Sequence, residues 1–117
     1  DRISWLDATP EKVRQGLASR GPEFVAAHSL IEAQYFANGC FLQPDELIRN
    51  AGRLASIPME IIQSRYDMVC PADAAFRLKN ACPHARLTLI QQNGHAMTEA
   101  VYPALKASLA RLAEIAT

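Results

Sequence analysis

The pattern of apolar and polar positions changes character near residue 57 of the chain. Before that point it predicts helices alone, separated by proline and glycine. Thr9 is a suitable N-cap for a helix that begins at Pro10. Further along, Asn38-Gly39 are residues that favour a left-handed helix end. Helices are therefore expected at residues 10–20, 22–37 and 44–56.

From residue 59 onward the pattern alternates between strands and helices. The apolar run 58–63 predicts a short, largely buried strand, and 86–90 predicts a second one. Helices are expected between these strands, at 71–82, and after them, at about 99–116. Because strands that alternate with helices form parallel sheets with right-handed crossovers, this region predicts a parallel β-α-β-α unit of the α/β class.

Two parallel strands make an incomplete sheet. Parallel sheets are normally covered on both faces and continued by further strands, so the apolar strand residues would lie beside an unpaired edge. The chain also begins at Asp1, within helix-like sequence. We therefore expect a piece of a longer protein that associates with another copy or with its missing N-terminal part.

Composition excludes several classes of function. Lysine and arginine together number 12, as do aspartate and glutamate, so the 117-residue chain has no electrostatic footprint for nucleic acid or an anionic membrane. No apolar stretch is long enough to span a bilayer. Three cysteines without C-x-x-C spacing indicate free thiols in a reducing compartment, which favours the cytoplasm. His28 and His84 lack acidic or thiol partners at metal-ligand spacing, so no metal site is expected.

The candidate chemistry follows the two predicted strands. Asp67 comes after the first strand, and Asn93-Gly94-His95 comes after the second. Because parallel strands end at one edge of a sheet, this carboxylate can orient the imidazole and stabilise its charged form. An acid and a Gly-His in this order are how α/β-hydrolases carry the last two members of a Ser–Asp–His triad. The nucleophile is missing, since no G-x-S-x-G motif occurs.

Each of these residues alone has a simpler interpretation. Asp67 could be a helix N-cap or a turn residue before Pro71, and His95 could be an ordinary turn histidine. Their joint occurrence at two strand ends, with the spacing of one crossover, favours the triad interpretation.

Three segments resemble a known family. Arg65–Pro71 is similar to the G-R-Y-D-x-V-C-P segment of proline iminopeptidases. Ile31–Gly39 is similar to the I-E-x-H-Y-F-x-N segment on a cap helix of the same family. Asp45–Asn50, followed by Ile57-Pro58, also fits the stretch that leads into the strand before the acid.

The resemblance implies a fold and a set of site residues. The fold is the C-terminal part of an α/β-hydrolase core at 57–117, preceded by the end of a helical cap domain at 1–56. By position, Asp67 matches the triad acid and His95 matches the general base. Glu32 matches a glutamate that binds the α-amino group of the substrate. Phe36 and Cys70 match walls of the pocket for the proline ring. Taken alone, Glu32 would be a solvated helix carboxylate, Phe36 cap-domain core, and Cys70 a small buried residue.

The chain also departs from the family pattern. Ser64 and Cys40 replace family glycines, and Gln34 replaces a histidine. In the segment that resembles W-E-G-A-T, Leu6 stands where the family has a second amine-binding carboxylate, and Asp7 lies one position away. This departure bears on the strictness of proline specificity.

The resemblance implies a serine-type aminopeptidase that releases N-terminal proline from peptides and needs no cofactor. This chain would supply only the acid and the base, so the isolated chain is expected to be inactive. Two alternatives stay open: another α/β-hydrolase that acts on small amides or esters, and a non-catalytic interaction module with hydrolase-like sequence.

Overall fold

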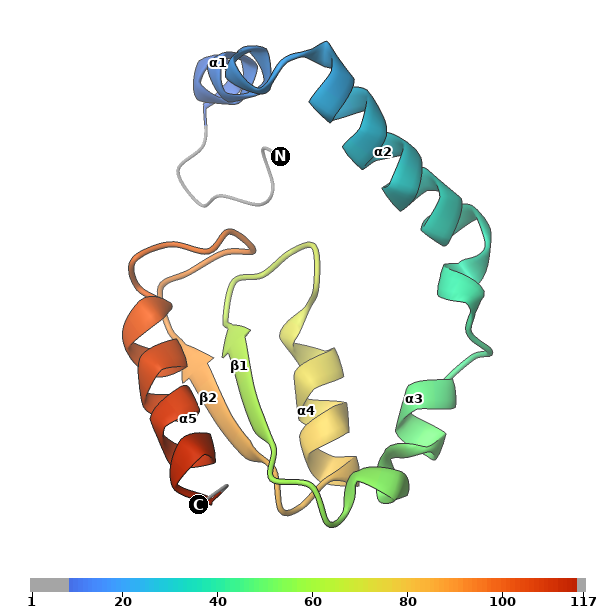
Figure 1. Ribbon diagram of the computed structural model, residues 1–117, viewed down its shortest axis with the longest axis vertical. Coiled ribbons are helices and arrows are strands. Elements are labelled where there is room, and N and C mark those ends of the chain that lie inside the picture. Colours follow the sequence, from blue (N-terminus) through green and yellow to red (C-terminus); the bar gives the residue numbers. More distant parts are fainter. Residues whose placement is uncertain (1–8, 116–117) are drawn as a thin grey trace.

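The computed structural model describes residues 9–115 and shows a curved helical arm that leads into a small unit of strands and helices (Figure 1). In chain order the elements are α1 (Pro10–Arg20), α2 (Pro22–Ala37), the 3-10 helix η1 (Gly39–Phe41), α3 (Glu46–Arg49), the 3-10 helix η2 (Ala51–Leu54), β1 (Glu60–Ser64), α4 (Ala72–Ala81), β2 (Arg86–Ile90) and α5 (Tyr102–Ile115).

The first two helices begin and end where the sequence predicts. Thr9 caps α1, because its Oγ1 accepts a hydrogen bond from the backbone N–H of Lys12 at 3.2 Å. Gly21 separates α1 from α2 with a φ of 78°, a backbone conformation that other residues rarely adopt. Gly39 follows α2 with a φ of 56°, in the left-handed region expected of a helix end.

The prediction of one continuous third helix at 44–56 is wrong, because the structure has the separate short helices α3 and η2 there. Asp45 lies in the left-handed region with a φ of 57°, so no right-handed helix passes through it. At the other end, Asn50 Nδ2 donates to the carbonyl oxygen of Glu46 at 2.8 Å. Such local side-chain bonds compete with helix continuation.

Two further boundaries differ from the predictions. β1 begins at Glu60 rather than at residue 58. The last helix begins at Tyr102 rather than near Glu99, because a turn precedes it in which Val101 N–H donates to the carbonyl oxygen of Thr98 at 3.0 Å.

β1 and β2 pair in parallel, with Glu60 opposite Arg86 and Ser64 opposite Ile90. They are the two strands of the sheet in the described part of the chain, and α4 connects them. Successive strand residues point to opposite faces of a sheet, and here Ile61 packs near Leu78 of α4 whereas Glu60 contacts Arg111 of α5. The helices α4 and α5 therefore cover opposite faces of the sheet (Figure 1).

The packed interior is small. On the α4 face, Ala51, Cys82 and Ala85 are buried, and they pack against partly buried residues that include Met59 and Ile61. The core therefore consists mainly of small side chains, which bury little apolar surface.

The α5 face of the sheet carries a polar network. The Glu60 carboxylate accepts hydrogen bonds from Arg111 Nε at 2.7 Å and Arg111 Nη2 at 2.8 Å. Ser108, which is buried, donates to the same carboxylate at 3.0 Å. Arg111 above all lowers the pKa of the Glu60 carboxyl from 4.5 to about 2. This network joins α5 to the first residue of β1.

The helical arm is extended and poorly covered. The radius of gyration of the Cα atoms is 16.8 Å, against about 13 Å for a compact domain of about 100 residues. No residue of α1 or α2 is buried, and Leu30 and Phe36 are each 71% exposed. Within residues 9–115, no helix combines the length and the apolar character needed to cross a membrane.

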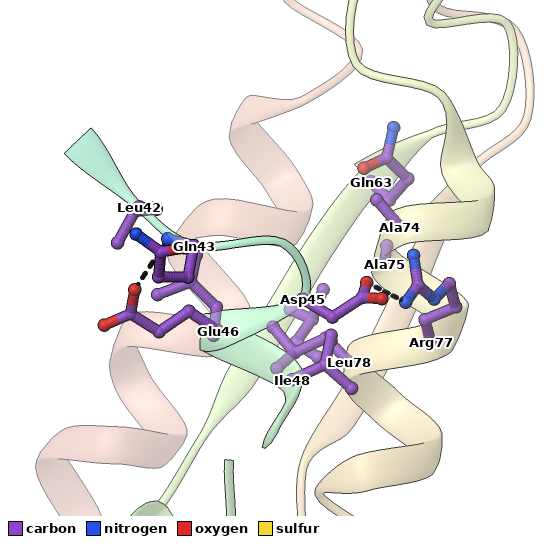
Figure 2. Close-up of a pocket in the computed structure, with 12 residues that line it drawn as sticks. Leu42, Gln43, Asp45, Glu46, Ile48, Gln63, Ala74, Ala75, Arg77 and Leu78 are labelled. Carbon is purple, nitrogen blue, oxygen red and sulfur yellow. Dashed lines mark hydrogen bonds and ion pairs between the residues drawn. The ribbon is translucent and has the colours of Figure 1, made fainter. Parts of the chain in front are cut away.

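A pocket of about 470 Å³ lies between α3 and α4, above β1 (Figure 2). Its lining is mostly apolar and includes Leu47, Ile61 and Leu78. An ion pair between Asp45 and Arg77 lies in its wall and joins the loop before α3 to α4. The pocket therefore lies where the arm meets the sheet, and its lining does not include Asp67 or His95.

Candidate active site

The carboxyl ends of β1 and β2 bring two loops together. The backbone N–H of Arg65 donates to the carbonyl oxygen of Ile90 at 2.9 Å, which extends the strand pairing by one residue. Beyond it, the N–H of Tyr66 donates to the carbonyl oxygen of Asn93 at 3.1 Å. The loop that carries Asp67 is thus hydrogen-bonded through its backbone to the loop that carries His95.

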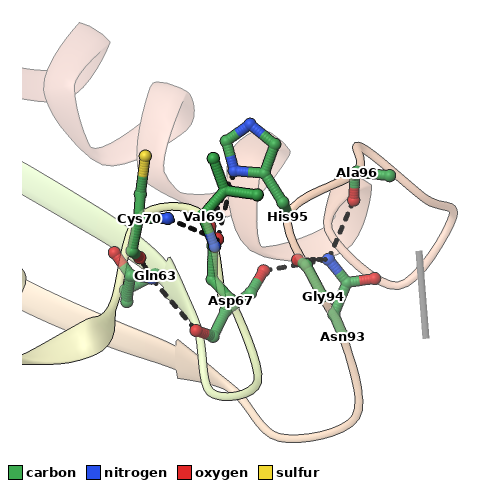
Figure 3. Close-up of polar contacts among 9 residues, drawn as sticks. Gln63, Asp67, Val69, Cys70, Asn93, Gly94, His95 and Ala96 are labelled. Atoms are coloured by element: carbon green, nitrogen blue, oxygen red, sulfur yellow. Dashed lines mark hydrogen bonds and ion pairs between the residues drawn. The ribbon is translucent and has the colours of Figure 1, made fainter. Parts of the chain in front are cut away.

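Asp67 and His95 are hydrogen-bonded to each other, as the sequence predicts. His95 Nδ1 lies 3.0 Å from Asp67 Oδ2 and 3.1 Å from Oδ1 (Figure 3). An ionised carboxylate can only accept, so Nδ1 carries the hydrogen and Nε2 is the ring nitrogen that can take up a proton. The Asp67 side chain is 9% exposed, whereas the His95 side chain is 40% exposed. The carboxylate is therefore sheltered, and the imidazole is accessible.

Backbone hydrogen bonds hold the Asp67 carboxylate in place. Its Oδ1 accepts from the N–H of Cys70 at 2.7 Å and from the N–H of Val69 at 3.0 Å. Burial by itself would raise the pKa of the Asp67 carboxyl, but the hydrogen bonds from Cys70, His95 and Val69 outweigh burial and lower it. The acid therefore stays ionised at neutral pH, in the state that orients an imidazole.

Asn93 is a residue of this site that the sequence interpretation assigned only to a turn. It is 3% exposed, and its Nδ2 donates to Ser64 Oγ at 2.9 Å, to Gly94 O at 2.9 Å and to Ala96 O at 3.0 Å (Figure 3). Its Oδ1 accepts from the hydroxyl of Thr98. Asn93 thereby connects the end of β1 to the loop on both sides of His95. Its place next to Gly94-His95 is the only sequence signal for this role.

Cys70 lies beside the Asp67–His95 pair. One ligand-type atom from each of Asp67, Cys70 and His95 lies within 4.8 Å of the others. The carbonyl oxygen of Cys70 accepts from Gln63 Nε2 at 3.0 Å, which ties the end of this loop back to β1. The thiol is free and exposed rather than buried.

The other predicted substrate-binding residues lie on α2, away from this pair. Glu32 Oε2 lies 3.4 Å from His28 Nδ1, and both side chains are more than half exposed. Phe36 is exposed one turn further along. Among residues 9–115, α2 packs mainly against α1 and η1, and no hydrogen bond or ion pair joins it to Asp67 or His95. Leu6 and Asp7, the residues of the second amine-binding position, lie outside the described residues.

Comparison with known proteins identifies relatives over most of the chain. No protein-family model matches it. It is 44% identical over 79 residues to a probable proline iminopeptidase of Leptolyngbya boryana, and 43% identical over 77 residues to a proline iminopeptidase of Xanthomonas citri. The chain is a homologue of the proline iminopeptidases. A proline iminopeptidase of Arabidopsis thaliana is 35% identical over 88 residues, which is 74% of this chain.

The matches cover only part of each iminopeptidase. They span 67% of this chain but 25% of the Leptolyngbya protein, and 65% of this chain but 25% of the Xanthomonas protein. For the Arabidopsis protein the matched share is 22% of its length. The chain therefore spans about a quarter of the length of the proline iminopeptidases that it matches.

Proposed function

We propose that this chain supplies the acid and the base of a serine-type aminopeptidase that releases proline from the N-terminus of peptides. The observation that carries the proposal is the Asp67–His95 hydrogen bond of 3.0 Å, formed between loops at the carboxyl ends of adjacent parallel strands. The similarity to proline iminopeptidases gives this pair its expected chemistry.

In this proposal each side chain has one task. A serine that is absent from this sequence attacks the carbonyl carbon of the prolyl residue, and His95 Nε2 accepts the serine proton. Asp67 holds the imidazole through Nδ1 and stabilises the positive charge that the ring gains. His95 then returns the proton to the leaving amine, and water hydrolyses the acyl-enzyme by the same route. Backbone N–H groups outside this chain would stabilise the oxyanion.

The proposal also divides the chain into two parts. Residues 57–117 belong to an α/β-hydrolase core, and residues 1–56 belong to a helical cap that covers the active site. Glu32 binds the protonated α-amino group of the substrate by a charge-assisted hydrogen bond, and Phe36 and Cys70 line the slot for the pyrrolidine ring. Support for the cap comes from the uncovered side chains of α2, which need a partner surface.

The test uses the longer polypeptide that this proposal requires, with a chromogenic prolyl amide as substrate. His95→Ala should lower kcat by at least ~10³, as loss of a triad base does. His84→Gln is the matched control: His84 Nε2 contacts the carbonyl oxygen of Ile57 in the part of the fold away from Asp67, so it should keep activity. Equal activity of His95→Ala and the unmodified protein would exclude the catalytic role.

A second candidate is another α/β-hydrolase that acts on small amides or esters. The observation that favours it is the separation of Glu32 and Phe36 from the Asp67–His95 pair. Within residues 9–115, the side chains proposed to bind the substrate amine and the proline ring therefore do not lie beside that pair. Faster hydrolysis of an N-blocked amide or a simple ester than of the free prolyl amide would favour this candidate.

A further inference from the structure

The exposed thiol of Cys70 stands next to two other groups that can ligate metal ions. Among residues 9–115, Asp67, Cys70 and His95 each offer a ligand atom, all within 4.8 Å of one another. Figure 3 shows the sulfur of Cys70 and the imidazole of His95 extending to the same side of the Asp67 carboxylate. We propose that these three residues form a reversible binding site for Zn²⁺ and that an ion bound there blocks the Asp67–His95 pair.

The spacing of His95 and Asp67 suits two ligands of a tetrahedral ion. With Zn–O and Zn–N bonds of about 2.0 Å, two neighbouring ligand atoms lie roughly 3.3 Å apart. His95 Nδ1 and Asp67 Oδ2 are 3.0 Å apart, so both can bind one ion after a shift of a few tenths of an ångström. The Cys70 side chain is exposed and can rotate to bring its sulfur closer.

The chemistry of the donors selects the class of cation. A thiolate, an imidazole and a carboxylate together suit Zn²⁺ and related borderline metals, whereas Mg²⁺ and Ca²⁺ prefer oxygen ligands alone. Three protein ligands leave a fourth tetrahedral position for water. The Asp67 Oδ1 atom already accepts hydrogen bonds from Val69 and Cys70, and these fix the carboxylate so that Oδ2 faces the ion.

Metal binding changes the protonation of two ligands. With His95 neutral, the hydrogen on Nδ1 must leave so that Nδ1 can bind the ion, and Nε2 takes up a proton in its place. The Cys70 thiol loses its proton to solvent, so one proton is released for each ion bound. His95 Nε2 then carries a hydrogen and cannot accept one from a serine. The bound ion therefore inhibits the proposed base directly, and its affinity rises with pH.

The other thiols of the chain provide internal controls. Cys40 is exposed like Cys70, but it is not part of a group of metal-ligating residues within residues 9–115. Cys82 is buried, and its sulfur lies 3.7 Å from the carbonyl oxygen of Ala51. A metal ion that selects this site should thus distinguish Cys70 from both other cysteines.

The experiment titrates the 117-residue chain with Co²⁺, whose absorption reports thiolate ligation, and then displaces Co²⁺ with Zn²⁺. One equivalent should bind, and Cys70→Ser and His95→Ala should each weaken binding by at least ~10-fold. Cys40→Ser and His84→Gln should bind as the unmodified chain does. If Cys40→Ser abolished the thiolate band, or Cys70→Ser preserved it, the assignment would be wrong.

A second measurement needs no variant, and so it holds even where a substitution prevents folding. Zn²⁺ should slow alkylation of Cys70 by iodoacetamide, measured by peptide mass spectrometry, and leave Cys40 unaffected. Equal protection of both thiols would overturn the proposal. Both readouts are independent of catalysis, so they separate failure of the metal site from failure of the proposed aminopeptidase function.

Discussion

Asn93 Nδ2 donates a hydrogen bond to Ser64 Oγ at 2.9 Å, and so joins the last residue of β1 to the loop that precedes His95. The same amide group donates to the carbonyl oxygens of Gly94 and Ala96, on either side of that histidine. This buried side chain therefore helps to hold the imidazole in position relative to β1, together with the backbone hydrogen bonds between the two loops. Because Asp67 lies in the loop that follows β1, this connection also contributes to the spacing of Asp67 and His95.

The first prediction concerns Asn93. Asn93→Asp keeps the acceptor for the Thr98 hydroxyl but removes the donors to Ser64, Gly94 and Ala96. In the longer active polypeptide kcat should fall by about 10²-fold, the cost expected of a misplacement near 1 Å, while KM changes little. Steady-state kinetics across a pH series measures both, with Thr98→Ser, which keeps a hydroxyl donor, as the control. A change in KM alone would show that Asn93 does not position His95.

The second prediction concerns Glu32. Glu32→Gln removes the charge proposed to bind the substrate α-amino group but leaves Asp67 and His95 intact. Preference for free over blocked N-termini should weaken by about 1.5–3 kcal/mol, the range for a hydrogen bond to a charged group. Ratios of kcat/KM for the two substrates measure it. Glu23→Gln, which removes an exposed carboxylate from the first turn of the same helix, should leave the ratio unchanged.

If Glu32→Gln also leaves that ratio unchanged, Glu32 is an ordinary surface carboxylate. This result would favour the second candidate function, a hydrolase that acts on small amides or esters.

The third prediction concerns acid stability. Arg111 above all lowers the pKa of Glu60 from 4.5 to about 2, so the unfolded chain binds a proton here more readily than the folded one. The contribution of Glu60 to the free energy of unfolding is complete above about pH 4.5 and is lost as the pH falls towards 2. Glu60→Gln should therefore destabilise the chain at pH 7 and flatten the dependence of stability on pH in that window.

Urea denaturation at a series of pH values measures this effect. The loss at pH 7 should be about 1.5–3 kcal/mol, because two hydrogen bonds from a guanidinium and one from Ser108 lose their charged acceptor. Glu99→Gln, at an exposed turn residue, is the control. An unchanged acid-unfolding profile for Glu60→Gln would mean that the network does not contribute to stability.

The fourth prediction concerns self-association. The exposed apolar side chains of α2 and the unpaired sheet edges should drive the 117-residue chain to associate with further copies. Leu30→Asn should weaken association about 10- to 100-fold, since burial of a leucine contributes about 1.5–3 kcal/mol. Sedimentation at several concentrations measures it, with Ala26→Asn on the same helix as the control. A monodisperse monomer that binds no hydrophobic dye would contradict the prediction.

The sequence alone determined most of the local structure of this chain and which carboxylate and imidazole meet at the end of the sheet. Thr9, Gly21 and Gly39 set helix boundaries through capping and backbone conformation, which depend on near neighbours only. The order of strands and helices placed Asp67 and His95 at one sheet edge, because parallel strands joined by one helix must end together. The resemblance to proline iminopeptidases likewise rested on short contiguous motifs.

Only the tertiary structure decided which other distant residues lie together. The start of α3 at Glu46 depends on the conformation of Asp45, whose carboxylate pairs with Arg77 of α4, and no local pattern indicates that contact. The role of Asn93 depends on Ser64, which is the last residue of β1. The grouping of Cys70 with Asp67 and His95 likewise joins two loops. Hydrogen bonds and shared ligand geometry act between atoms close in space, so the order of residues specifies them only through the fold.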